Sequence, residues 1–136
     1  MLNTAKLSER LLDVNILLLN DEDDCKRLIA YVKKPILRRR FPPTLPLRTL
    51  RNLLQKPLSS YLKNSSLSRA VFFRYTKSLD TDEFFCFEME NELRDLGFYD
   101  IKSGDSILIA LSMEAADGIR RDIQSKEVPG SLLRDM

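Results

Sequence analysis

The sequence predicts a single α+β domain in which a mixed sheet of four or five strands packs against one helix. Three observations favour this architecture. Apolar residues recur at every second position over residues 12–18, leucines recur at helical spacing over residues 47–54, and three apolar segments of strand-like composition follow. A chain of 136 residues, 43% hydrophobic and 31% charged, suits one folded domain.

The first half of the chain supplies two predicted strands. Residues 1–10 form a polar lead-in, and the alternation over residues 12–18 predicts a strand with one face in the core. Residues 25–32 fit either a short helix or a long loop. A second strand is expected at residues 36–41, where the triplet Arg38–Arg40 indicates an exposed edge.

One helix and three further strands are expected next. Between Pro46 and Pro57, four leucines fall on one helical stripe: Leu47, Leu50, Leu53 and Leu54. Strands are predicted at residues 70–75 and 84–89, and another at 107–111 after the turn sequence Ser103-Gly104-Asp105. The order strand, strand, helix, strand, strand, strand is the β-grasp arrangement. Residues 112–136 are expected to be a helical or disordered tail.

Three segments together resemble a ubiquitin-like domain: the strand at residues 12–18, the helix segment PPTLPLRTLRNLLQ and the closing segment ELRDLGFYDIKSGDSILIAL, residues 92–111. The closing segment, and with it the helix segment, resembles the ubiquitin-like domain of tubulin-folding cofactor E, and cofactor B more distantly. The likeness covers roughly residues 11–111, with residues 21–34 as an apparent insertion in the first hairpin. In the closing segment it is carried by Leu93, Leu96, Phe98, Tyr99, Gly104 and Asp105.

The resemblance implies a protein-interaction domain of a chaperone that assembles or disassembles tubulin heterodimers, with Leu93 and Leu96 buried. The glycine-rich and leucine-rich-repeat domains that accompany this domain in the family are not in the sequence. The chain is therefore either a part of such a chaperone or a stand-alone relative. A ubiquitin-like adaptor that links clients to the proteasome is the alternative function.

Several functional classes are disfavoured by residue content. The chain has no histidine and no motif of an enzyme, so we expect neither catalysis nor a cofactor or metal. None of the four glycines is adjacent to another, which argues against a conjugated modifier ending in Gly-Gly. Cys25 and Cys86 read as ordinary thiols, and no signal segment or membrane span is visible. These features predict a cytoplasmic location and no membrane partner, and the resemblance to a tubulin cofactor implies that the location could also be cytoskeletal.

Strand alternation predicts an apolar binding patch. If Val71 and Phe73 point inward, as do Ile107 and Ile109, the opposite side chains form a small exposed patch with an arginine at its rim. This predicted patch consists of Phe72, Arg74, Leu108 and Ala110. The alternative is that the tail or the insertion covers it.

Charge predicts a second binding surface. From Cys25 to Lys56 there are ten basic residues and no acid, whereas Asp80 to Asp100 holds eight acids and one arginine. The two stretches could attract each other within the fold, or the first could dock an acidic partner such as tubulin. Nucleic acid is less favoured, because no reader motif accompanies the charge. The predicted basic surface comprises Lys33, Lys34, Arg38, Arg39, Arg40, Arg48 and Arg51.

Overall fold

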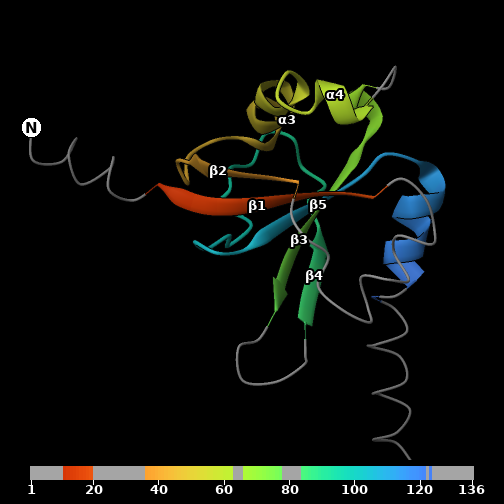
Figure 1. The fold of residues 1–136 in the computed structure, drawn as a ribbon. Coiled ribbons are helices and arrows are strands. Elements are labelled where there is room, and N and C mark those ends of the chain that lie inside the picture. Colours follow the sequence, from red (N-terminus) through yellow and green to blue (C-terminus); the bar gives the residue numbers. More distant parts are fainter. Residues whose placement is uncertain (1–10, 20–35, 63–65, 78–83, 122, 124–136) are drawn as a thin grey trace, which may run out of the picture.

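A computed structural model describes residues 11–19, 36–62, 66–77, 84–121 and 123 of the chain (Figure 1). Five strands and three short helices are defined, and residues 113–121 form a further helix, here called the C-terminal helix. The elements are β1 (Leu12–Leu19), β2 (Leu37–Phe41), α3 (Leu47–Gln55), α4 (Ser59–Leu62), η1 (Leu67–Arg69), β3 (Val71–Lys77), β4 (Phe84–Glu88) and β5 (Ser106–Ala110).

The five strands form one mixed sheet in the order β2-β1-β5-β3-β4. β1 and β5 run parallel in the middle of the sheet, with Ile16 opposite Ile107, and every other neighbouring pair is antiparallel. Two hairpins are thus joined through α3, and the last strand inserts between them. This is the β-grasp arrangement, and the predicted fold class is confirmed.

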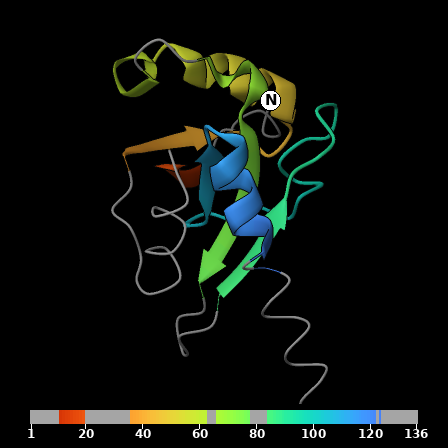
Figure 2. The same cartoon turned by 90° about the vertical axis from the view of Figure 1, so that its right-hand side faces the viewer.

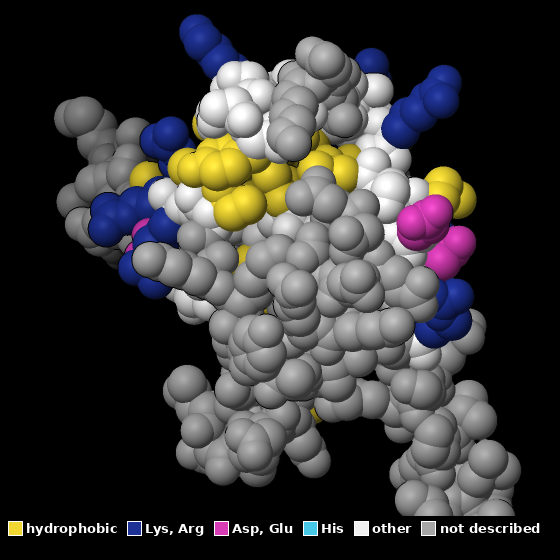
Figure 3. All heavy atoms as spheres, turned by 45° about the vertical axis from the view of Figure 1, so that its right-hand side comes forward, with side chains coloured by type: hydrophobic (Ala, Val, Ile, Leu, Met, Phe, Trp, Pro, Cys, Tyr) yellow, Lys and Arg dark blue, Asp and Glu magenta, His cyan; other side chains and the backbone are white. Residues whose placement is uncertain are grey.

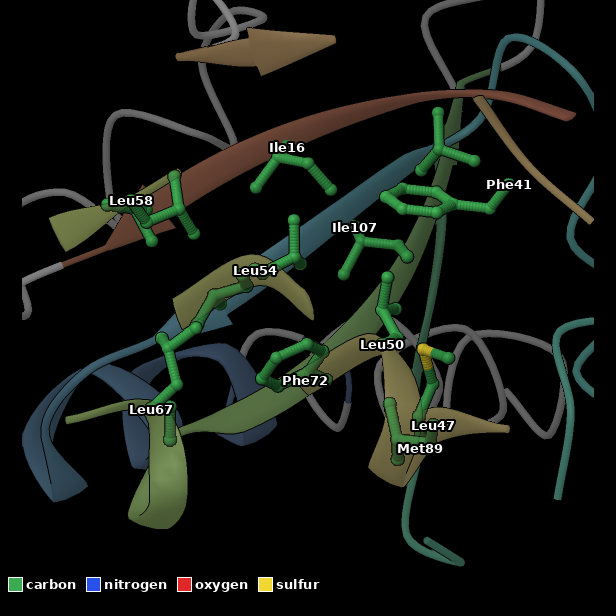
Figure 4. Packing of buried hydrophobic residues seen from close by; sticks show 14 of the residues in the cluster. Ile16, Phe41, Leu47, Leu50, Leu54, Leu58, Leu67, Phe72, Met89 and Ile107 are labelled. Atoms are coloured by element: carbon green, nitrogen blue, oxygen red, sulfur yellow. The ribbon is translucent and has the colours of Figure 1, made fainter. Parts of the chain in front are cut away.

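The face of the sheet toward α3 carries the larger core. Leu47, Leu50 and Leu54 lie three and four residues apart, so they share one side of α3, and each is at most 1% exposed. They pack on side chains that alternate along the strands, including Ile16, Phe41, Phe72, Met89 and Ile107 (Figure 4). The prediction that Leu53 shares this stripe is wrong, since Leu53 lies on the outer side of the helix and is 52% exposed.

The opposite face of the sheet carries a second core. Its strand residues are the alternate ones, and the C-terminal helix covers them with three small or medium side chains (Figures 1 and 2). Its buried members are Leu17, Leu19, Phe73, Tyr75, Cys86, Leu108, Ala110, Ala115, Ala116 and Ile119.

Polar contacts fix the C-terminal helix at both ends. The amide of Ala115 donates to the Ser112 hydroxyl (3.1 Å), which caps the first turn. Arg120 donates from Nε and Nη2 to both oxygens of Glu88 at the end of β4 (2.8 and 3.0 Å).

Of the predicted tail, residues 112–121 are therefore part of the packed domain, while the lead-in and the insertion at residues 21–34 lie outside the described residues. None of the described helices is long and apolar enough to cross a membrane.

Candidate interaction surfaces

The predicted apolar patch is not exposed, and the expectation that it is free for a partner is wrong. Phe72 and Leu108 are both 0% exposed and lie on opposite faces of the sheet. Phe72 packs under α3, whereas Leu108 and Ala110 pack under the C-terminal helix. Ile107 and Ile109 point into the core beneath α3, so their predicted orientation is correct. Val71 and Phe73 point to the opposite face, beneath the C-terminal helix, so the prediction that they share a face with Ile107 and Ile109 is wrong.

Arg74, the fourth residue of that patch, is used inside the fold. Its side chain is 16% exposed, its Nη1 donates to the Tyr99 carbonyl (3.3 Å), and its Nε lies 3.6 Å from Oδ2 of Asp105. Asp105 also accepts a hydrogen bond from the amide of Lys102 (2.8 Å). Arg74 therefore links β3 to the closing turn rather than standing at the rim of a binding patch.

The closing segment forms a tight network at the start of β5. Gly104 has φ +97°, a conformation that favours glycine, and its amide donates to the Asp13 carbonyl (2.7 Å). The Tyr99 hydroxyl donates to the Asn91 carbonyl and accepts from the Asn91 amide, both at 2.7 Å. Burial is the largest cause that raises the pKa of Tyr99 above 10.0. The segment is thus a rigid frame for the end of the sheet.

The two leucines of the closing segment have different environments. Leu96 is 0% exposed and belongs to the α3-side core, as the resemblance implies. Leu93 is 76% exposed, so the implied burial of Leu93 is wrong. On either side of Leu93, the carbonyls of Glu92 and Arg94 accept hydrogen bonds from the amides of Arg48 and Leu47 at the start of α3, so the backbone here is tied to the helix while the Leu93 side chain stays in solvent.

The predicted basic surface is divided over separate elements. Arg38, Arg39 and Arg40 are exposed on β2, at one edge of the sheet. Arg38 donates to Asn15 Oδ1 (3.0 Å) and Arg40 pairs with Asp13 (3.2 Å). Figure 3 likewise shows Lys and Arg side chains at several separate places on the face that it draws. Lys33 and Lys34 lie outside the described residues.

The two arginines of α3 differ in availability. Arg48 is exposed. Arg51 is bound bidentately to Glu92 (3.0 and 2.8 Å), donates to the carbonyls of Leu67 and Ala70, and stacks 4.6 Å from the centre of the Phe72 ring. Its guanidinium is therefore committed to holding α3, η1 and the closing segment together, and Arg48 alone faces solvent.

A polar groove runs beside α3. It has a volume of about 790 Å³ and is lined by Arg48, Arg51, Asn52, Gln55, Ser66, Ser68, Glu92 and Leu93. Exposed Leu93 gives this groove an apolar rim. No group of acidic or cysteine residues that could hold a metal ion occurs in the described part of the chain.

An aromatic pair on β4 was not singled out by sequence reasoning. Phe85 and Phe87 are 51% and 50% exposed, whereas Cys86 between them is buried. β4 is the last strand in the order, at the edge opposite β2. The sequence FFCFE could have revealed the pair, because alternate residues of a strand point to opposite faces. With Cys86 buried on one face, Phe85 and Phe87 must lie on the other.

The strand order and the single crossing helix define a ubiquitin-like β-grasp domain. The chain resembles the C-terminal ubiquitin-like domain of mouse tubulin-specific chaperone e, with TM-score 0.48 and 22% identity over 76% of this chain and 88% of that one. It also resembles a ubiquitin-like domain from tubulin-binding cofactor B, with TM-score 0.47 and 14% identity over 74% and 89% of the two chains. The N-terminal ubiquitin-like domain of Drosophila melanogaster tubulin-binding cofactor B gives 0.44 and 17%, over 76% and 86%. No family model and no curated protein matches the sequence.

Proposed function

We propose that this chain is the protein-interaction domain of a chaperone resembling tubulin-folding cofactor E, acting in the assembly or disassembly of tubulin heterodimers. The observation that carries the proposal is the closing segment, residues 92–111. It has the family's sequence pattern, and in this fold it supplies both the frame around Tyr99 and the central strand β5. The β-grasp fold is compatible with this role.

The surface chemistry supports binding to an acidic protein. Arg39 and Arg48 are exposed, and no ion pair is recorded for either among the described residues. Tubulin is a suitable target for such cations, because opposite charge speeds association and favours the complementary partner. The location that follows from this proposal is the cytoplasm or the cytoskeleton.

The test is binding of the purified chain to purified tubulin heterodimer. We expect co-elution in size-exclusion chromatography that weakens as salt is raised, since exposed charges are screened over about 10 Å at 0.1 M salt. A variant with Arg39→Glu and Arg48→Glu should bind at least severalfold more weakly. Lys102→Glu is a control for the loss of a single exposed cation, because Lys102 is also exposed but already paired with Asp100. The same affinity for all three chains, or no complex with tubulin at all, contradicts the proposal.

A further inference from the structure

The sheet has two edges of different chemistry. β2 presents three consecutive arginines, which is how natural proteins discourage the addition of another strand at an edge. β4 has the sequence FFCFE, without lysine, arginine or proline, and none of the other described strands pairs with its outer side. β4 is therefore the unguarded edge.

The outer edge of β4 has backbone groups free to form hydrogen bonds with an added strand. The amide of Met89 donates to the Phe72 carbonyl (2.9 Å), and the antiparallel register continues with Arg74 opposite Phe87. In such a ladder, residues on one strand direct their amides alternately toward and away from the partner strand. The amide of Glu88, next to Met89, is therefore directed away from β3, toward the open side.

The α3-side face of β4 offers aromatic contact. Phe87 lies opposite Arg74, and Arg74 lies opposite Ile107 of the α3-side core, so Phe85 and Phe87 point to that same face. They lie beyond the cover of the helix and stay half exposed. The Arg74 guanidinium lies 5.8 Å from the centre of the Phe87 ring, within the range of a cation–π contact.

The other face of β4 is hollowed and acidic. A hollow of about 370 Å³ lies between β4 and the C-terminal helix, lined by Cys86, Phe87, Glu88, Glu90, Arg120 and Ile123. Two carboxylates, Glu88 and Glu90, and one guanidinium, Arg120, line it, and Arg120 is bound to both oxygens of Glu88. Figure 2 shows the C-terminal helix crossing the sheet beside β4. Glu90 forms no ion pair with another of the described residues, so a cation entering this hollow would meet its negative charge.

We propose that the β4 edge is a docking site for an extended protein segment in which apolar and basic residues alternate. Such a segment would add to the sheet as a further strand. Its apolar side chains would lie on Phe85 and Phe87, and its basic side chains would enter the acidic hollow, since alternate residues of a strand point to opposite faces. The inference rests on the proposed interaction function and names a surface and a partner chemistry for it.

The experiment uses the isotope-labelled full chain and a short synthetic peptide of alternating valine and lysine. We expect NMR signals of residues 84–90 to shift and the affinity to fall with added salt. A matched peptide of valine and glutamate should not bind. The variant Phe85→Ser with Phe87→Ser should weaken binding about tenfold or more, because central aromatic contacts dominate such interfaces. Leu53→Ser, at an exposed leucine on the outer side of α3, is the control and should bind like the parent.

Three outcomes would overturn the proposal. The first is equal binding of the two peptides, and the second is that the shifts occur at β2 or the α3 groove instead of β4. The third is self-association of the chain that the double variant abolishes in analytical ultracentrifugation, because a second copy would then be the occupant. If the double variant unfolds, Glu90→Lys replaces it in the test. Glu90 is exposed, and reversing its charge should lower the affinity for the valine–lysine peptide severalfold. The peptide contains no tubulin sequence, so failure of tubulin binding and failure at β4 are separate results.

Discussion

The two faces of the sheet are both buried, but by helices of very different composition. On one face, α3 contributes Leu47, Leu50 and Leu54 to a core that extends to Leu58 and Leu67. On the other, the C-terminal helix buries Ala115, Ala116 and Ile119, with partly buried Ile123 beyond them, and the strands supply most of the large side chains. A helix with little apolar surface can therefore still exclude water from one face of the sheet, provided that the strands beneath it supply the large apolar side chains.

The largest expected effect is on the α3 face. Leu50→Ala removes a side chain that is 0% exposed and leaves a cavity between α3 and the sheet. We expect a loss of about 2–5 kcal/mol in the free energy of unfolding. Chemical denaturation measures it, with Leu53→Ala on the outer side of the same helix as the control. An equal loss for both variants would mean that the two leucines are not packed differently.

A smaller loss is expected on the opposite face. Ala116→Asp places a carboxylate in the buried space under the C-terminal helix. The helix can undock and return this carboxylate to solvent while the sheet stays folded. We expect a cost of about 1–3 kcal/mol. Amide exchange in residues 113–121 should become faster while β1 stays protected. If the whole sheet lost protection together with the helix, the two faces would be one cooperative unit and the comparison would be wrong.

Each face also has a bidentate arginine–glutamate pair, and the two pairs differ in burial. Arg51 is 14% exposed and Arg120 is 37% exposed. Arg51→Met leaves the Leu67 and Ala70 carbonyls without their donor, so we expect a loss of about 2–3 kcal/mol. Arg120→Met should cost about 0.5–1 kcal/mol, because solvent screens the more exposed pair. Thermal unfolding of both variants checks the order, and a reversed order contradicts it.

The smallest expected effect is on alkaline titration. Burial is the largest cause that raises the pKa of Tyr75, on the helix-covered face, and of Tyr99, in the closing segment, above 10.0. The protonated phenols therefore favour the folded state, and this contribution is complete below pH 10 and is lost as the pH rises further. The absorbance of phenolate against pH should show a high-pH component that Tyr75→Phe and Tyr99→Phe each reduce. Unchanged titration in both variants would contradict the described burial.

The fold was predictable because its strongest patterns are local. The leucine spacing of α3 and the apolar run ILIAL each predict an element without reference to the rest of the chain. The Gly104 turn was also readable, since a positive φ favours glycine. The expected edge position of residues 36–41 agrees with the place of β2 in the sheet.

The binding patch was not predictable for a specific physical reason. The alternation test needs one apolar and one polar face, but Val71, Phe72 and Phe73 are consecutive apolar residues in a strand that is buried on both sides. The segment therefore gave no information about which side faces α3. The tail was one of the two covers considered for the patch, but the sequence could not decide for it, because the buried side of the C-terminal helix consists mainly of alanine and Gly118 further weakens its helical signal.

We propose that the chain binds a protein partner through exposed surface while both buried faces of the sheet stay closed. Hydrogen exchange of the chain, alone and with tubulin heterodimer, can test this. We expect added protection at exposed segments, either β4 or the neighbourhood of Arg39 and Arg48, with residues 113–121 unchanged. If residues 113–121 lost protection and no exposed segment gained any, the covered face around Leu108 would be the docking surface and the proposal would be wrong.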